Sequence, residues 1–128
     1  MYCLAQGMKV ISYNAGEGRI MPEYIQVLTT VEHKADAEKI AKSLVKKRLA
    51  ACVQIVGPLT SYFHWQGNLD SASEYLCLIK SRNELFAELE IEITHLHPYE
   101  VPEILAMPII YGNKDYLNWL AAELVTEP

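Results

Sequence analysis

The stretch His97-Pro98-Tyr99-Glu100 holds the side chains in this sequence that are best suited to bind a metal ion. An imidazole nitrogen suits copper and zinc, and the affinity of most nitrogen-containing sites for divalent ions peaks at copper. We therefore identify His97 and Glu100 as candidate metal ligands. A second interpretation stays open for His97, in which its ring ends a helix and hydrogen-bonds a backbone carbonyl group.

Cysteine supplies a further candidate ligand, because a thiolate binds Cu(I) and zinc. Cys52 and Cys77 both lie in predicted strands, where a cysteine is usually a small apolar residue. Cys77 is assigned to the core. No CxxC or HxxxH spacing occurs in the sequence, so it carries no signature of a zinc site. The other histidines are interpreted as surface residues: His33, His64 and His95.

Motifs of the common enzyme classes are missing from the sequence. It has no GxSxG, no GxxxxGKS/T, no GxGxxG and no HExxH pattern. These motifs place a nucleophile, a phosphate-binding loop or a zinc ion where a reaction needs it. We therefore predict that the protein is not an enzyme.

Composition and charge exclude several partners. The 128 residues carry a net charge of −5, which argues against a nucleic-acid partner, because binding the phosphate backbone needs a basic face. No apolar stretch approaches the roughly 18–20 residues that cross a membrane, so no membrane partner is expected. The first residues match neither a secretory signal nor a transit peptide. With only three cysteines, the sequence predicts a reduced, cytoplasmic protein.

The length predicts one main domain, and the N-terminal residues differ from the rest. Asn14-Ala15-Gly16-Glu17-Gly18 is a loop-forming cluster, and no helical or strand period runs through this segment. We interpret residues 1–22 as an N-terminal extension that is partly mobile. The domain is placed at residues 23–128.

Hydrophobic periodicity predicts the elements that position the candidate residues. Strands are predicted at residues 24–30, 51–65, 74–81 and 103–110, and helices at residues 37–49, 83–96 and 114–124. Pro58 lacks a backbone N–H and indicates a bend or bulge within the second strand. A hairpin turn is predicted at residues 66–70. Asn83 is predicted to N-cap the second helix, which His97-Pro98-Tyr99 ends.

This order, β-α-β-β-α-β with an additional C-terminal helix, is the ferredoxin-like topology of the α+β class. It forms an antiparallel four-stranded sheet with two crossover helices against one face. Residues 75–79 and 104–110 are nevertheless apolar at successive positions, so both of their faces are apolar. An uncovered apolar face is uncommon in a soluble monomer. We therefore expect self-association.

Four stretches of this sequence strongly resemble the CutA family, which is named for divalent-cation tolerance. They are residues 48–53 (RLAACV), 62–67 (YFHWQG), 97–103 (HPYEVPE) and 111–119 (YGNKDYLNW). The resemblance spans about residues 24 to 122. It implies a ferredoxin-like protomer and a compact homotrimer akin to the PII signalling proteins. It also implies a role in the response to copper and other divalent metal ions, without an established catalytic reaction.

The resemblance also implies a site. Some family members place copper ligands at the position of His97 and at a cysteine near the end of the first strand, where this sequence has Thr29. That departure removes the softest ligand, so the implied cofactor is weakly bound Cu(II) or another divalent cation. The resemblance also makes Cys52, in the family's Ala-Ala-Cys motif, a candidate metal ligand, and an apolar residue inside a strand is its alternative interpretation. Glu100 and Glu103, with Lys80, would line a cleft between subunits, and a plain ion-pair network is their alternative interpretation. The aromatic residues assigned to packing and the interface are Trp65, Tyr99, Tyr116 and Trp119.

A second functional class is compatible with the same resemblance. A PII-like regulatory trimer would bind a small metabolite or a partner protein in the inter-subunit cleft, with metal binding incidental. The sequence offers no glycine-rich phosphate loop that would single out a nucleotide as the ligand.

Overall fold

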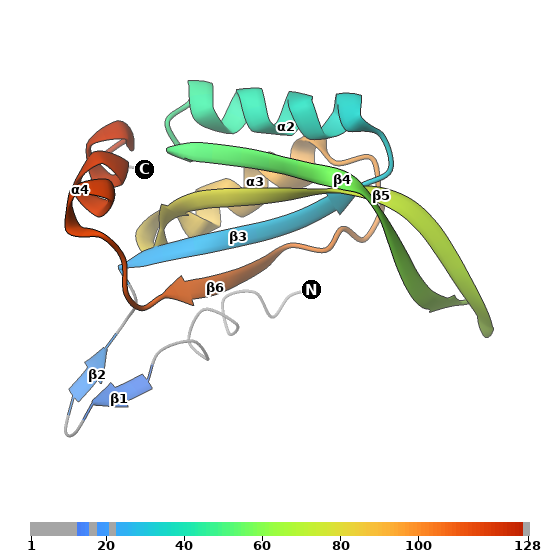
Figure 1. Cartoon of the computed structure of the whole chain (residues 1–128), viewed down its shortest axis with the longest axis horizontal. Helices are drawn as coiled ribbons and strands as arrows, with labels where there is room; N and C mark the ends of the chain where they lie inside the picture. Colours follow the sequence, from blue (N-terminus) through green and yellow to red (C-terminus); the bar gives the residue numbers. More distant parts are fainter. Residues whose placement is uncertain (1–12, 16–17, 21–22, 127–128) are drawn as a thin grey trace.

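Four antiparallel strands form the central sheet of this chain (Figure 1). The computed structural model describes residues 13–15, 18–20 and 23–126. The sheet order is β4-β5-β3-β6. In chain order the main elements are β3 (Tyr24–Val31), α2 (Lys34–Lys46), β4 (Cys52–Trp65), β5 (Asn68–Arg82), a 3-10 turn (Asn83–Leu85), α3 (Phe86–Leu96), β6 (Leu105–Ile109) and α4 (Lys114–Glu123). The predicted ferredoxin-like α+β fold is confirmed.

Helices α2 and α3 cover one face of this sheet and form the main core with it. The apolar positions of α2 and α3 recur at helical spacing, so each helix presents one apolar stripe to the sheet. The alternate residues of β3 and β5 point at these stripes. The buried core residues include Ile25, Val27, Cys77 and Ile79 from the strands and Ile40, Leu44, Leu89 and Ile93 from the helices. Cys77 is thus a core residue, as predicted.

The opposite sheet face stays largely without a cover in the single chain. Met107 and Leu105 are partners of Gln26 and Leu28 and lie on this face, 45% and 52% exposed. Val56 lies on the same face of β4 and is 48% exposed. Two crossover helices can cover only one side, so strands that are apolar on both faces leave apolar side chains in water.

Helix α4 packs at one end of the sheet in a second, smaller cluster. Its Leu120 is buried together with Leu85 and Leu124. The Asn113 side chain caps α4 by accepting a 2.9 Å hydrogen bond from the backbone N–H of Tyr116. None of the described helices is both long enough and apolar enough to cross a membrane.

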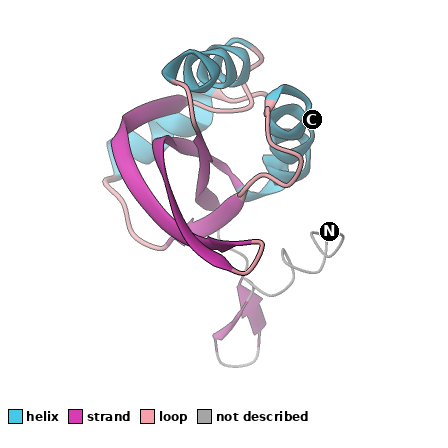
Figure 2. Ribbon diagram, turned by 90° about the vertical axis from the view of Figure 1, so that its right-hand side faces the viewer, coloured by secondary structure: helices cyan, strands magenta, loops and turns pink. Residues whose placement is uncertain are grey.

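The β4–β5 hairpin is long and projects beyond the helices, and its far half curls away from the rest of the sheet (Figures 1 and 2). The pairing register shifts between Val56 and Leu59, so the bulge predicted at Pro58 is confirmed. Strand β5 begins at Asn68, six residues before the prediction. Most of the extra residues are polar and exposed, and they pair with β4 without showing an apolar pattern.

Two sequence-based predictions are corrected. Asn83 is not an N-cap, because α3 begins at Phe86 and Asn83 opens the preceding 3-10 turn. Its backbone N–H donates a 2.9 Å hydrogen bond to the carbonyl oxygen of Glu23, and this tertiary contact sets its position. The N-terminal segment, expected to lack strands, contains β1 (Tyr13–Ala15) and β2 (Gly18–Ile20), which pair antiparallel. Strands of three residues are too short to show a period.

The division at residue 22 stays a prediction. Most of the proposed extension, with its partly mobile character, lies outside the residues that the structure describes.

The bulge leaves no room for a side chain at Gly57. A Cβ atom there would lie 2.6 Å from Cδ2 of Tyr75 and 3.0 Å from the carbonyl oxygen of Glu74. We expect Gly57→Ala to lower the free energy of unfolding by about 1–3 kcal/mol, because the paired strand must shift. Urea denaturation at one fixed protein concentration measures this loss.

Gly67→Asn is the matched control. Gly67 has a positive φ of 83°, which Asn tolerates, and nothing lies within 4 Å of the added Cβ. This variant should unfold close to the wild type. Equal stability of Gly57→Ala and the wild type would contradict the close approach of Gly57 to Tyr75 and Glu74.

Candidate functional site

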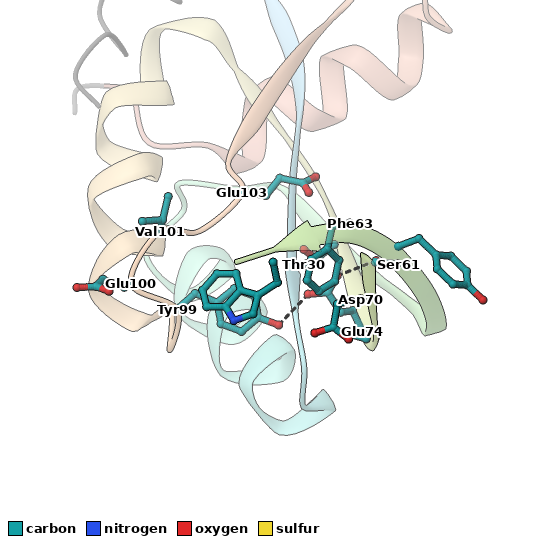
Figure 3. Close-up of a pocket in the computed structure, with 12 residues that line it drawn as sticks. Thr30, Ser61, Phe63, Asp70, Glu74, Tyr99, Glu100, Val101 and Glu103 are labelled. Atoms are coloured by element: carbon teal, nitrogen blue, oxygen red, sulfur yellow. Dashed lines mark hydrogen bonds between the residues drawn. The ribbon is translucent and has the colours of Figure 1, made fainter. Parts of the chain in front are cut away.

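A groove of about 900 Å3 opens between the far half of the β4–β5 hairpin and the segment that joins α3 to β6 (Figure 3). Ser61 and Phe63 project from β4, opposite Ala72 and Asp70 of β5. The α3–β6 segment contributes Tyr99 and the residues that follow it. Partners in an antiparallel pair share one sheet face, so the groove has a defined floor.

Glu74 is the buried carboxylate of the groove and is only 8% exposed. The Ser61 hydroxyl donates a 2.8 Å hydrogen bond to its Oε1 atom, and the Tyr99 hydroxyl donates a 2.7 Å hydrogen bond to its Oε2 atom (Figure 3). Burial raises the pKa of Tyr99 far above its ordinary value, and the bond to the Glu74 carboxylate acts in the same direction. Tyr99 therefore remains a neutral donor at physiological pH.

His97 stands behind Tyr99 and is also buried. Its Nδ1 atom accepts a 3.1 Å hydrogen bond from the backbone N–H of Tyr99, so the ring hydrogen lies on Nε2. Nε2 then donates to the carbonyl oxygen of Thr30 at 2.9 Å. Burial lowers the pKa of His97, and this effect outweighs the opposing bond to Thr30. A neutral imidazole with both nitrogens engaged results.

One connected polar network thus joins four elements. It runs from the end of β3 through His97 and Tyr99 to Glu74 on β5 and Ser61 on β4. The rings of His97 and Tyr99 add an edge contact, with centroids 4.7 Å apart. Such a network can hold one carboxylate at a fixed place beside the groove. Ser61 and Tyr99 act here as hydrogen-bond donors to this carboxylate.

The structure gathers four of the seven predicted cleft and interface residues at this groove. Trp65, Tyr99, Glu100 and Glu103 line it. Lys80 does not, because its Nζ atom donates to Oε1 of Gln54 at 2.7 Å. The remaining two, Tyr116 and Trp119, lie on α4 with ring centroids 5.6 Å apart. Whether these residues meet across subunits concerns an assembly and stays a prediction.

The candidate metal ligands do not form one site within a single chain. Cys52 pairs with Lys80, and Thr30 beside His97 pairs with Leu76, so about 13 Å of β5 separates the two positions. Figure 3 shows Glu100 pointing away from Glu74. No group of three or more His, Cys, Asp or Glu side chains that could hold a metal ion occurs in the described part of the chain.

The geometry around His97 matches the helix-end interpretation. A metal ion on Nδ1 would have to displace the Tyr99 amide, so a ligand role for His97 stays a prediction. Thr29 is fully buried on the core face, opposite Cys77, and it does not line the groove. The remaining histidines are exposed, as predicted: His33, His64 and His95.

Sequence reasoning missed Glu74, Ser61 and Asp70. Glu74 opens the predicted third strand, where a charged residue next to an apolar run is the one signal that marks it. Ser61 and Asp70 lie 9 residues apart in the sequence and line the same groove only because the hairpin pairs their strands. Pairing across strands is a tertiary property that no local pattern reveals.

The Tyr99 hydroxyl is expected to contribute measurably to stability. Tyr99→Phe removes one of the two donors to the buried Glu74 carboxylate and should lower the free energy of unfolding by about 1–3 kcal/mol. Tyr62→Phe is the control, since Tyr62 is 73% exposed. Chemical denaturation of both variants tests this, and equal losses would contradict the role of the bond.

His97 makes stability depend on pH. Its pKa is lower in the folded than in the unfolded protein, where it is about 6.5, so the folded state binds fewer protons. Stability should therefore fall as pH drops from about 7 to about 5. His97→Gln retains a donor and an acceptor but cannot titrate, and its stability should fall less over this range.

His95→Gln, at an exposed position in the last turn of α3, provides the control and should keep the wild-type profile. Thermal unfolding across this pH range supplies the measurement. If the stability of His97→Gln and that of the wild type changed equally with pH, His97 would not be the titrating group.

This chain is similar in sequence to proteins of a known family. The family model described as "CutA1 divalent ion tolerance protein" matches residues 25–123. The divalent-cation tolerance protein CutA of Thermus thermophilus is 50% identical over 94 residues, which cover 73% of this chain and 91% of the relative. The chloroplastic protein CutA of Arabidopsis thaliana is 42% identical over 75% of this chain, and the match covers 53% of that protein.

A solved structure shows the same fold. The periplasmic divalent cation tolerance protein CutA of Archaeoglobus fulgidus superposes with a TM-score of 0.76 at 39% identity. The superposition covers 78% of this chain and 97% of that one. The names of these relatives give two different locations, the chloroplast and the periplasm.

Proposed function

Since this chain belongs to the CutA1 divalent ion tolerance protein family, we propose that it acts as a homotrimer in the response to divalent metal ions. The trimer would bind copper or another divalent cation weakly and take part in metal homeostasis. The observation that carries this proposal is the charge of the groove. Asp70, Glu74, Glu100 and Glu103 line it, and no lysine, arginine or histidine does so among its described residues.

Such a groove concentrates cations, because like charges with low-dielectric walls between them focus the field. The atoms of the groove that could coordinate a cation are carboxylate and hydroxyl oxygens, which suit hard divalent cations better than Cu(I). One chain does not bring three ligands together in its described part. A second subunit at the groove would supply the missing ligands, which is why the proposal couples binding to assembly.

The exposed sheet face supports self-association, and the number of three subunits follows from the family resemblance alone. The apolar side chains at Val56, Leu105 and Met107 are each close to half exposed. Strands β4 and β6 are both edge strands, each paired on one side. Copies of the same chain are the simplest cover for such a face, because a closed ring of identical subunits buries the same surfaces of every subunit and leaves no edge strand open. We also propose that the protein lies in the cytoplasm and does not catalyse a reaction.

Metal binding is expected to depend on the groove carboxylates. In native mass spectrometry of the full chain titrated with Cu(II) and Zn(II), we expect a trimer that takes up metal. Asp70→Asn combined with Glu103→Gln should weaken this uptake by about tenfold, because two of the four charges are removed. His97→Ala tests the predicted imidazole ligand in the same experiment.

Glu38→Gln is the matched control, because Glu38 is exposed on α2 and outside the groove. A monomer at micromolar concentration would contradict the assembly. Equal metal uptake by the carboxylate variant and the control would contradict binding in the groove, and equal uptake by His97→Ala would assign His97 to structure alone.

The volume of the groove favours a second candidate function. A PII-like regulatory trimer would bind a small metabolite or a partner protein there, and about 900 Å3 lies within the usual range of small-molecule pockets. A thermal-shift screen separates the two. Stabilisation by a metabolite and by no metal ion would favour this second function.

A further inference from the structure

Arg48 has a backbone conformation that glycine adopts far more readily. It follows Lys47, the C-cap of α2, and has a positive φ of 59°. The N–H of Arg48 donates a 3.0 Å hydrogen bond to the carbonyl oxygen of Val45, and the N–H of Leu49 donates a 2.9 Å bond to that of Leu44. These two bonds form a Schellman motif, in which glycine is the usual residue at the position of Arg48. A Cβ atom destabilises this left-handed conformation.

Three hydrogen bonds join Arg48 to the C-terminal end of α4. Its Nη1 atom donates to the backbone carbonyl oxygen of Glu123 at 3.0 Å and to the Oε1 atom of the same residue at 3.2 Å. In return, the N–H of Val125 donates to the carbonyl oxygen of Arg48 at 2.9 Å. Glu123 is the last residue of α4, where the carbonyl groups lack partners inside the helix. A guanidinium group there provides a donor and a charge that favours the helix dipole.

The side chain of Arg48 therefore has a role that glycine could not perform. The residue that ends α2 also holds the end of α4, and glycine at this position would relieve the backbone strain but would lose the guanidinium group. A residue kept in a strained conformation is a reason to look for a role of its side chain. The bonds to Glu123 identify that role.

Other attachments of α4 within the chain are few. Leu120 is the one residue of α4 that is fully buried, and it packs with Leu85 and Leu124 in the small cluster at the end of the sheet. Helix α2, in contrast, buries three residues in the main core. The side chains of Arg48 and Glu123 are 59% and 41% exposed, so water competes for their ion pair. Elements with few buried apolar side chains open at a low cost in free energy.

We propose that Arg48 is a latch, and that α4 opens as a unit when the latch is released. The latch consists of the bonds from Arg48 to Glu123 and Val125. Opening uncovers the cluster around Leu85, at the end of the sheet where α4 lies (Figure 1). The latch bonds lie within one chain, so each copy has them whether or not copies associate. The inference goes beyond the proposed function and does not depend on metal binding.

Hydrogen exchange of the full chain, measured by mass spectrometry on its peptides, reports how often α4 opens. Arg48→Gly removes the guanidinium group and introduces the residue that best fits this φ. Exchange of the backbone amides of residues 117–123 should become about tenfold faster, because a hydrogen bond from a charged group contributes about that factor to an equilibrium constant. Exchange in α2 should stay the same or become slower, since the strain at its end is relieved.

Glu123→Gln and Gln66→Gly separate the parts of this effect. Glu123→Gln removes the ion pair but keeps the backbone carbonyl group that Arg48 also binds, so exchange in α4 should increase only about twofold, as expected for an exposed pair. Gln66 is the other non-glycine residue with a positive φ among the described residues, at 52°, and it lies in the turn of the β4–β5 hairpin. Gln66→Gly is the matched control and should leave exchange in α4 unchanged.

Wild-type exchange of α4 in Arg48→Gly would overturn the proposal. The same result is expected if neighbouring copies of the chain, rather than Arg48, hold α4. Equal acceleration in α2 and α4 would also overturn it, because Arg48 would then support the whole domain. Sedimentation of the same samples measures the assembled mass. If exchange in α4 became faster only when this mass fell, association would be what protects α4, and the proposal would be wrong.

Discussion

The rest of this structure depends on one geometric constraint: two crossover helices can cover only one face of a four-stranded sheet. Helices α2 and α3 bury Ile25, Val27 and Ile79 from one side and provide the main hydrophobic stabilisation of the chain. The other face is therefore free to carry other features. It combines exposed apolar residues such as Met107 with the floor of the groove. Interaction surface and candidate binding site thus result from the same uncovered face.

The polar network around Glu74 provides hydrogen bonds to a carboxylate that is buried at the edge of that face. Ser61 and Tyr99 satisfy its two oxygens, and His97 fixes the turn from which Tyr99 projects. His97 is held by the carbonyl oxygen of Thr30, so the end of α3 is tied to the end of β3. A network of this kind positions the α3–β6 segment against the hairpin and thereby sets the width of the groove.

Family membership and the chemistry of the groove are two separate reasons to expect a cation as the ligand. The family is described by tolerance of divalent ions, whereas the single chain offers dispersed oxygen donors and no group of three metal-binding side chains in its described part. Weak binding completed by a neighbouring subunit is consistent with both.

The sequence by itself determined the order of elements, the ferredoxin-like topology, the bulge at Pro58 and the apolar character of both sheet faces. These features follow from local periodicity and backbone chemistry, which are properties of neighbouring residues. Only the tertiary structure decided that Cys52 lies about 13 Å along the sheet from the position of His97, and that Glu74 meets Tyr99. Residues distant in the chain are brought together by strand register and helix packing, which depend on all the elements at once.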